Sequence, residues 1–152
     1  MVAAGGLAAG TALWMRDRTP RLTAAALDEA HALWLKRGPA EYDLVLRVQN
    51  DRAAPIRYSI ACRHGTVAEF KAGDGSGAQP SAVQGAYYTV AGLFEVLRRE
   101  LEMAEGPPVP GAPAKAILRA DFDPEMGYPR VFKRLAGHGA STFIHVEGLT
   151  PR

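Results

Sequence analysis

The clearest helical pattern in this chain lies in residues 89–104, which read TVAGLFEVLRRELEMA. Thr89 is a typical N-cap, and Tyr88 and Leu93 are spaced as the hydrophobic staple on either side of it. The apolar side chains recur at helical spacing and form one face of the helix: Val90, Leu93, Phe94, Leu97, Leu101 and Ala104. This face must be buried, so we expect it to lie against the inward side of a sheet.

The other side of this predicted helix is charged. Glu95, Arg98, Arg99 and Glu102 are spaced to form pairs three or four residues apart, which is typical of a solvated face. Residues 106–108, Gly-Pro-Pro, end the helix, and a proline-rich stretch then leads to the next strand.

A second helix is predicted before the first strand. Thr23 is its expected N-cap, and Gly38 followed by Pro39 ends it after Arg37. Leu27, Ala30 and Trp34 recur at helical spacing, so these three side chains are predicted to face the core.

Strands are predicted in two groups of three, one after each helix. In the first, apolar residues alternate with polar ones, as in Tyr42, Leu44, Leu46 and Val48. The expected strands span residues 42–48, 56–62, 66–71, 115–122, 130–136 and 141–149. The order α-βββ-α-βββ favours an α+β fold, with an antiparallel sheet of about five to six strands and both helices on one face.

Turn residues separate these strands. In residues 122–129, FDPEMGYP, Asp123 is placed to accept hydrogen bonds from its own turn, and Gly127 supplies the positive φ that a tight reversal needs. Residues 73–85 are rich in Gly, Ser and Pro and are predicted to form a surface loop. A further turn is expected at Gly137-His138-Gly139.

Composition limits the function classes. The net charge of the 152 residues is +2, which does not indicate a nucleic-acid-binding protein. The single cysteine, Cys62, cannot form an intrachain disulfide or a thiolate cluster. The histidines show no metal-ligand spacing, so we expect no cofactor and no metal.

The N-terminal segment differs sharply from the rest of the chain. Residues 2–15 contain no charge and are followed by Arg16-Asp17-Arg18. The apolar run is shorter than the roughly 20 residues that a spanning helix needs. We interpret residues 1–18 as a truncated signal or anchor segment and residues 22–149 as one α+β domain. The arginines that follow the segment favour the alternative, a cytoplasmic domain, by the positive-inside rule.

Four short motifs are spread over residues 22–149: Trp34 with Tyr42, Gly65-x-Val67, Thr89-Val90-x-x-Leu93-Phe94 and Asp123-Pro124-x-x-Gly127-Tyr128-Pro129. With these motifs the chain resembles the bacterial domain of unknown function family 6174. The resemblance implies an exported or membrane-anchored protein and implies no activity. Some relatives carry paired cysteines near the second strand, whereas this chain has only Cys62.

Candidate polar sites are few. Asp121, Asp123 and Glu125 alternate as calcium ligands do, but the sixth and twelfth positions counted from Asp121 hold no Gly and no Glu, which excludes an EF-hand loop. A looser carboxylate site and a turn capped by Asp123 both stay open. His64 lies two residues after Cys62, but the thiol falls on the apolar side of its strand, which disfavours a catalytic pair.

A basic patch is the remaining candidate site. Arg130, Lys133 and Arg134, with Arg119 on the neighbouring strand and Phe132 between them, are predicted to lie on the outer face of the sheet. Such a patch would bind a polyanion or an anionic headgroup, although a solvated sheet face gives the same pattern.

No convergent catalytic constellation emerges from these residues. The leading hypothesis is therefore a non-enzymatic binding or interaction module, held at the cell envelope by its N-terminal segment. Its partner would be an envelope protein or an anionic headgroup. The alternative is a hydrolase or a small-ligand-binding enzyme that uses a pocket between the helices and the sheet.

Overall fold

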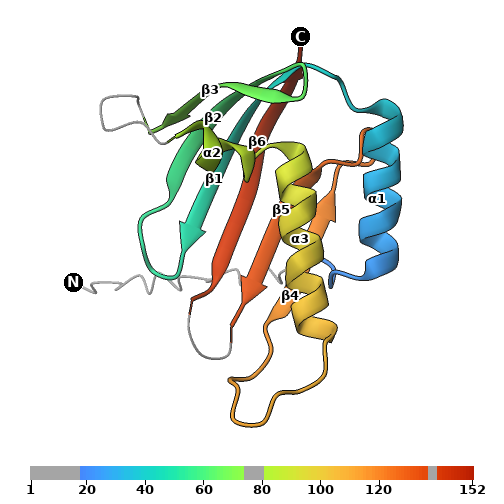
Figure 1. The fold of residues 1–152 in the computed structure, drawn as a ribbon, viewed down its shortest axis with the longest axis vertical. Helices are drawn as coiled ribbons and strands as arrows, with labels where there is room; N and C mark the ends of the chain where they lie inside the picture. Colours follow the sequence, from blue (N-terminus) through green and yellow to red (C-terminus); the bar gives the residue numbers. More distant parts are fainter. Residues whose placement is uncertain (1–17, 74–80, 137–139) are drawn as a thin grey trace, which may run out of the picture.

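A computed structural model describes residues 18–73, 81–136 and 140–152 (Figure 1). Residues 1–17 of the predicted segment 1–18 and the predicted turn at Gly137-His138-Gly139 lie outside the described residues. The elements are α1 (Ala24–Arg37), β1 (Tyr42–Asn50), β2 (Ile56–Arg63), β3 (Thr66–Ala72), α2 (Ala82–Ala86), α3 (Val90–Glu105), β4 (Ile117–Phe122), β5 (Pro129–Leu135) and β6 (Thr142–Pro151).

The strands form one six-stranded antiparallel sheet in the order β3-β2-β1-β6-β5-β4. The two groups of three strands therefore meet where β1 pairs with β6. In Figure 1 the helices lie on the same side of this sheet, with α1 and α3 next to each other and α2 near β3. The predicted α+β fold with an antiparallel sheet is confirmed.

The core lies between the sheet and the helices α1 and α3, and Leu27, Ala30 and Trp34 of α1 are buried in it as predicted. Val90, Leu93, Phe94, Leu97 and Leu101 are buried, as the helical pattern predicts. They meet the inward residues of β1, where Tyr42, Leu44, Leu46 and Val48 are all buried. The alternation along β1 and the helical stripe on α3 therefore describe the two sides of one apolar layer.

Helix α1 packs closely against the turn between β4 and β5. The Asp123 carboxylate accepts hydrogen bonds from the N–H groups of Glu125 at 3.0 Å and Met126 at 2.8 Å, which confirms that Asp123 caps its own turn. Gly127 has φ +83°, and a Cβ there would lie 2.2 Å from the carbonyl oxygen of Ala30 on α1. The turn packs so closely on α1 that only glycine fits at this position.

The prediction of a loop over residues 73–85 is wrong for its last part, because Ala82–Ala86 form α2. The Ser81 hydroxyl accepts a hydrogen bond from the Gln84 N–H, and the side-chain oxygen of Gln84 accepts one from the Ser81 N–H. This capping box starts a helix despite the neighbouring Gly and Pro residues. Gly85 lies against the ring of Phe70 on β3. Residues 74–80 lie outside the described part of the chain.

The chain enters the fold along the free edge of β4. The Leu22 N–H donates to the Leu118 carbonyl at 2.9 Å, and the Ala120 N–H donates to the Pro20 carbonyl at 3.1 Å. Residues 20–22 thus cover this edge of the sheet, which protects it from pairing with another chain. Among the described residues, no helix has the length and apolar character of a membrane span.

Candidate functional site: a groove along α3

Two adjoining cavities lie along one flank of α3, with volumes of about 570 and 280 Å³. The larger lies between α3, residues 107–116 and β5. The smaller lies between α3 and the inward side of β1, β5 and β6. We call the two cavities together the α3 groove. Glu100 and Arg134 are the residues that line both cavities, so they mark the point where the two meet.

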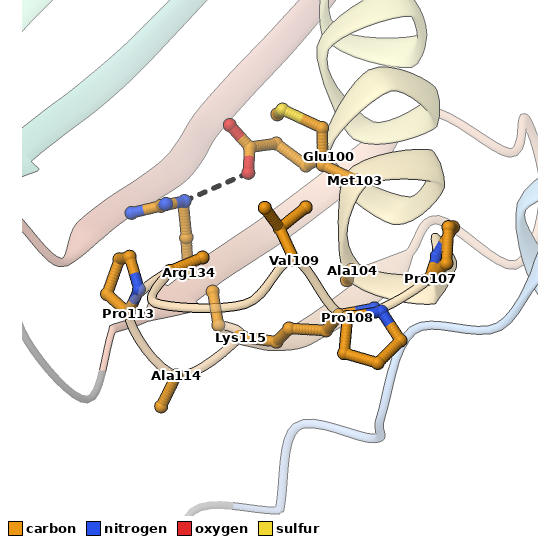
Figure 2. Close-up of a pocket in the computed structure, with 12 residues that line it drawn as sticks. Glu100, Met103, Ala104, Pro107, Pro108, Val109, Pro113, Ala114, Lys115 and Arg134 are labelled. Atoms are coloured by element: carbon orange, nitrogen blue, oxygen red, sulfur yellow. Dashed lines mark hydrogen bonds and ion pairs between the residues drawn. The ribbon is translucent and has the colours of Figure 1, made fainter.

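Glu100 and Arg134 form an ion pair in the middle of the groove. The Arg134 Nε donates to Glu100 Oε2 at 2.9 Å, and Arg134 Nη1 donates to the Ala140 carbonyl at 2.7 Å. The side chains of Arg134 and Glu100 are 32% and 22% exposed, so both charges are partly shielded from water. Figure 2 shows the pair at one side of the larger cavity. This ion pair lies at the junction of the two cavities, whose walls are mostly apolar.

The wall of the larger cavity opposite α3 is formed by residues 107–116 (Figure 2). This segment is rich in proline and alanine, and we call it the proline strap. The strap turns at residues 109–112, where the Ala112 N–H donates to the Val109 carbonyl at 3.1 Å. Lys115 donates to the carbonyl of Gly106 and so joins the strap to the end of α3. The remaining lining comes from Met103, Ala104, Pro107, Pro108, Ala112, Pro113, Ala114 and Ala116.

Aromatic side chains form the other end of the groove. Tyr88 stacks on Tyr58 with ring centroids 4.9 Å apart, and Phe70 lies 5.1 Å from Tyr58. Tyr87 and Tyr88 line both the smaller groove cavity and a further cavity of about 160 Å³ beside Phe70. Burial, followed by the neighbouring Tyr58, raises the pKa of Tyr88 above its usual value. Like a tyrosine with an ordinary pKa, Tyr88 is neutral at physiological pH, and its hydroxyl is able to donate a hydrogen bond.

The predicted basic patch does not gather on one face of the sheet. Phe132 is 2% exposed and lies in the core, and Arg134 reaches the helix side to meet Glu100. Lys133 lies directly opposite Arg119 in the register of β5 and β4. Arg130 is the extra residue of a bulge and pairs with Asp121 at 2.5 Å. The prediction of five residues on one face is wrong, because neighbouring residues of a strand point to opposite faces.

The other polar candidates lie apart from the groove. His64 is in the β2–β3 turn, with its side chain 89% exposed, and its Nδ1 lies 3.0 Å from Glu41 Oε1. Cys62, in contrast, is buried. Asp121 forms an ion pair with Arg130, and the Asp123 carboxylate accepts hydrogen bonds within its own turn. Within the described ranges, no three His, Cys, Asp or Glu side chains are placed to hold a metal ion.

The open face of the sheet carries shared ion pairs. Glu147 is the extra residue of a bulge in β6, and its carboxylate meets Arg47 at 2.7 Å and Arg57 at 2.8 Å. The Arg57 hydrogen bond, followed by the charge of Arg47, holds the pKa of Glu147 below its usual value. Acidic and basic groups therefore occur together on this face, which differs from the uniform basic patch that the sequence suggested.

Sequence reasoning named two residues of the groove, Phe132 and Arg134, for the wrong reason and missed the others. Arg134 was expected on the outer face, and Glu100 had no predicted role. One signal in the sequence could have indicated the site. Glu100 and Arg134 are charged residues, and each falls on the inward side of an element that is otherwise apolar there. Their pairing depends on how β5 lies under α3, which no local pattern specifies.

The chain was compared with known proteins. No protein-family model matches it, and no curated protein matches it either. The resemblance to domain of unknown function family 6174 therefore stays a prediction. Residues of two of its four motifs meet in space. The Trp34 ring lies edge-on to Tyr42 at 5.5 Å and to Tyr128 at 6.4 Å. These two motifs consequently describe packing between α1, β1 and the β4–β5 turn.

Proposed function

We propose that the protein is a non-enzymatic binding module that holds a small amphipathic ligand in the α3 groove. One observation carries the proposal: two adjoining cavities with apolar walls share a single ion pair, Glu100–Arg134. A ligand with an apolar body and one polar group matches this arrangement. The groove is also the region where the alternative hypothesis, an enzyme with a pocket between helix and sheet, would place its substrate.

The size and lining of the groove support a small-molecule ligand. Sites for such ligands usually measure about 300–1,000 Å³ and combine apolar walls with a few convergent polar groups. The larger cavity, at about 570 Å³, falls within this range. Asn50 and Thr142 add polar groups to the smaller cavity, beside the apolar side chains of Val48 and Ile144.

A neutral fluorescent probe tests this proposal. We expect N-phenyl-1-naphthylamine to bind the full chain saturably, with increased emission. Val109 points into the larger cavity in Figure 2, so Val109→Trp should fill it and weaken binding. Val83→Trp is the matched control, because Val83 is similarly exposed on α2, at 73% against 68%, and lines neither groove cavity. Equal binding by both variants, or no saturable binding, would contradict the proposal.

We further propose that the module is held at the cell envelope by residues 2–15. The support is the uncharged apolar composition of that segment. Fractionation of the full-length protein from its native host tests this part. Recovery with the membrane or in an exported fraction supports it, whereas recovery entirely in the cytosol removes the envelope association and leaves the groove proposal intact.

A further inference from the structure

Resting on the proposed function, we infer that the ligand of the α3 groove is an amphiphile with a carboxylate head, which Arg134 binds in competition with Glu100. The inference starts from the charges of the groove. Among the described residues, the charged side chains that line its two cavities are Arg134, Lys115 and Glu100. Two cations against one carboxylate leave an excess of one positive charge, which favours an anionic ligand.

Arg134 is built to receive a planar anion. Its two recorded hydrogen bonds, to Glu100 and to the Ala140 carbonyl, use two of the five N–H donors of the guanidinium. The bond to the Ala140 carbonyl also fixes the direction of the guanidinium fork. Lys115, by comparison, already donates to the Gly106 carbonyl at the far side of the cavity. Arg134 is therefore the cation that offers donors at the junction of the two cavities.

Glu100 acts as an internal substitute for the ligand head. A carboxylate already occupies the guanidinium, which shows that the site has the geometry for this group, with Nε and Oε2 2.9 Å apart. Arginine binds carboxylates through parallel N–H donors, and a fork of this kind discriminates against neutral heads. An incoming carboxylate competes with Glu100 for the same cation, and its apolar body lies against Met103 and the proline strap.

The alternative, a cationic ligand on Glu100, fits the groove less well. A cation would need Glu100 to leave Arg134, and Arg134 would then stay beside it as an unpaired like charge. The nearest additional charge in the groove, Lys115, is also positive. Both groups would oppose a cation, whereas both favour an anion.

Three amphiphiles with the same chain test the inference: dodecanoate and dodecyltrimethylammonium, each below its micellar concentration, and dodecanol below its solubility limit. Calorimetric titration of the full chain should show dodecanoate binding about tenfold or more tightly than dodecanol, and the ammonium most weakly, because a charge-assisted hydrogen bond is worth at least that factor. Equal binding of dodecanoate and dodecanol would overturn the carboxylate head and leave the groove proposal standing. A groove that binds none of the three, nor the neutral fluorescent probe, would overturn both.

Two variants separate an anion receptor from a merely structural ion pair. Glu100→Gln removes the competing carboxylate, so dodecanoate should bind several-fold more tightly while dodecanol is unchanged. Arg134→Met should reduce dodecanoate to the affinity of dodecanol. A purely structural pair would make both variants weaken every ligand alike, and that result would overturn the inference. Unfolding midpoints of both variants confirm that each is folded during the titration.

Discussion

The phenolic oxygen of Tyr42 accepts a hydrogen bond from the backbone N–H of Val90 at 3.0 Å. Tyr42 begins β1 and Val90 begins α3, and both residues are buried. The first N–H groups of a helix have no partner within the helix, so this donor would otherwise be unsatisfied. Thr89 caps the same helix end by accepting from the Gly92 N–H at 3.0 Å. A side chain of the sheet thus completes the N-terminus of α3.

Removal of the Tyr42 hydroxyl should destabilise the fold. Tyr42→Phe keeps the ring but leaves the buried Val90 N–H without its acceptor, which costs about 1–3 kcal/mol. Urea unfolding followed by far-UV circular dichroism measures the change. Tyr87→Phe is the control, because Tyr87 is 55% exposed, and it should change the unfolding free energy by less than about 0.5 kcal/mol. Equal losses in the two variants would contradict the assigned role of the hydroxyl.

Gly92→Ala should also destabilise the protein, against the usual trend for helices. Alanine in place of a helical glycine normally gains about 0.5–1 kcal/mol. Here the new Cβ would lie 2.0 Å from the Ala86 carbonyl oxygen, which belongs to the backbone and cannot rotate away. Overpacking of this kind costs about 1–3 kcal/mol, so the clash outweighs the helical gain.

Gly148→Ala is the matched control for this substitution. A Cβ at Gly148, on β6, meets no atom within 4 Å. The thermal midpoint of Gly148→Ala should therefore stay at or above that of the wild type, while that of Gly92→Ala falls. A rise in the midpoint of Gly92→Ala would show that α2 and α3 do not approach as closely as described.

The helices and most strands were predictable because their signals are local. Thr23 and Thr89 mark the starts of α1 and α3, and both accept a hydrogen bond from the N–H three residues on. The alternation of Tyr42, Leu44, Leu46 and Val48 matches their burial. Each of these signals involves residues within a few positions of each other, so it is recognisable in the sequence without knowledge of the rest of the fold.

The groove and the ion pairs were not predictable because they depend on long-range register. Glu147 and Arg130 are bulge residues. A bulge shifts the alternation of inward and outward side chains along the strand, so the sequence pattern alone assigns the following residues to the wrong face. The contact of Glu100 with Arg134 joins residues that are 34 positions apart. Only the placement of α3 across β5 brings the two together.

The core face of α3 gives a quantitative test of the fold. Leu97 is fully buried, so Leu97→Ala should cost about 2–5 kcal/mol through lost burial and the cavity that remains. Leu35→Ala is the matched control, because Leu35 is 74% exposed on α1. Chemical unfolding of both variants measures the difference. A loss below about 0.5 kcal/mol for Leu97→Ala would mean that a different face of α3 is buried.

Asp43 should titrate at unusually low pH. A hydrogen bond from Arg63 Nη2 at 2.7 Å, followed by one from Arg152, lowers the pKa of this carboxyl from its ordinary value of 3.8. The ionised form is favoured in the folded state, so its stabilising effect is present above the ordinary pKa and is lost as pH falls through the lowered one.

Carbon-detected NMR titration of the Asp43 side chain measures this directly. Arg63→Gln removes the hydrogen bond that lowers the Asp43 pKa most, so this pKa should rise. Arg98→Gln is the control, because Arg98 pairs with Asp28 on α1 at 3.0 Å and should leave Asp43 unchanged. A wild-type midpoint at or above 3.8, or the same midpoint in Arg63→Gln as in the wild type, would show that the arginines do not hold this carboxylate in solution.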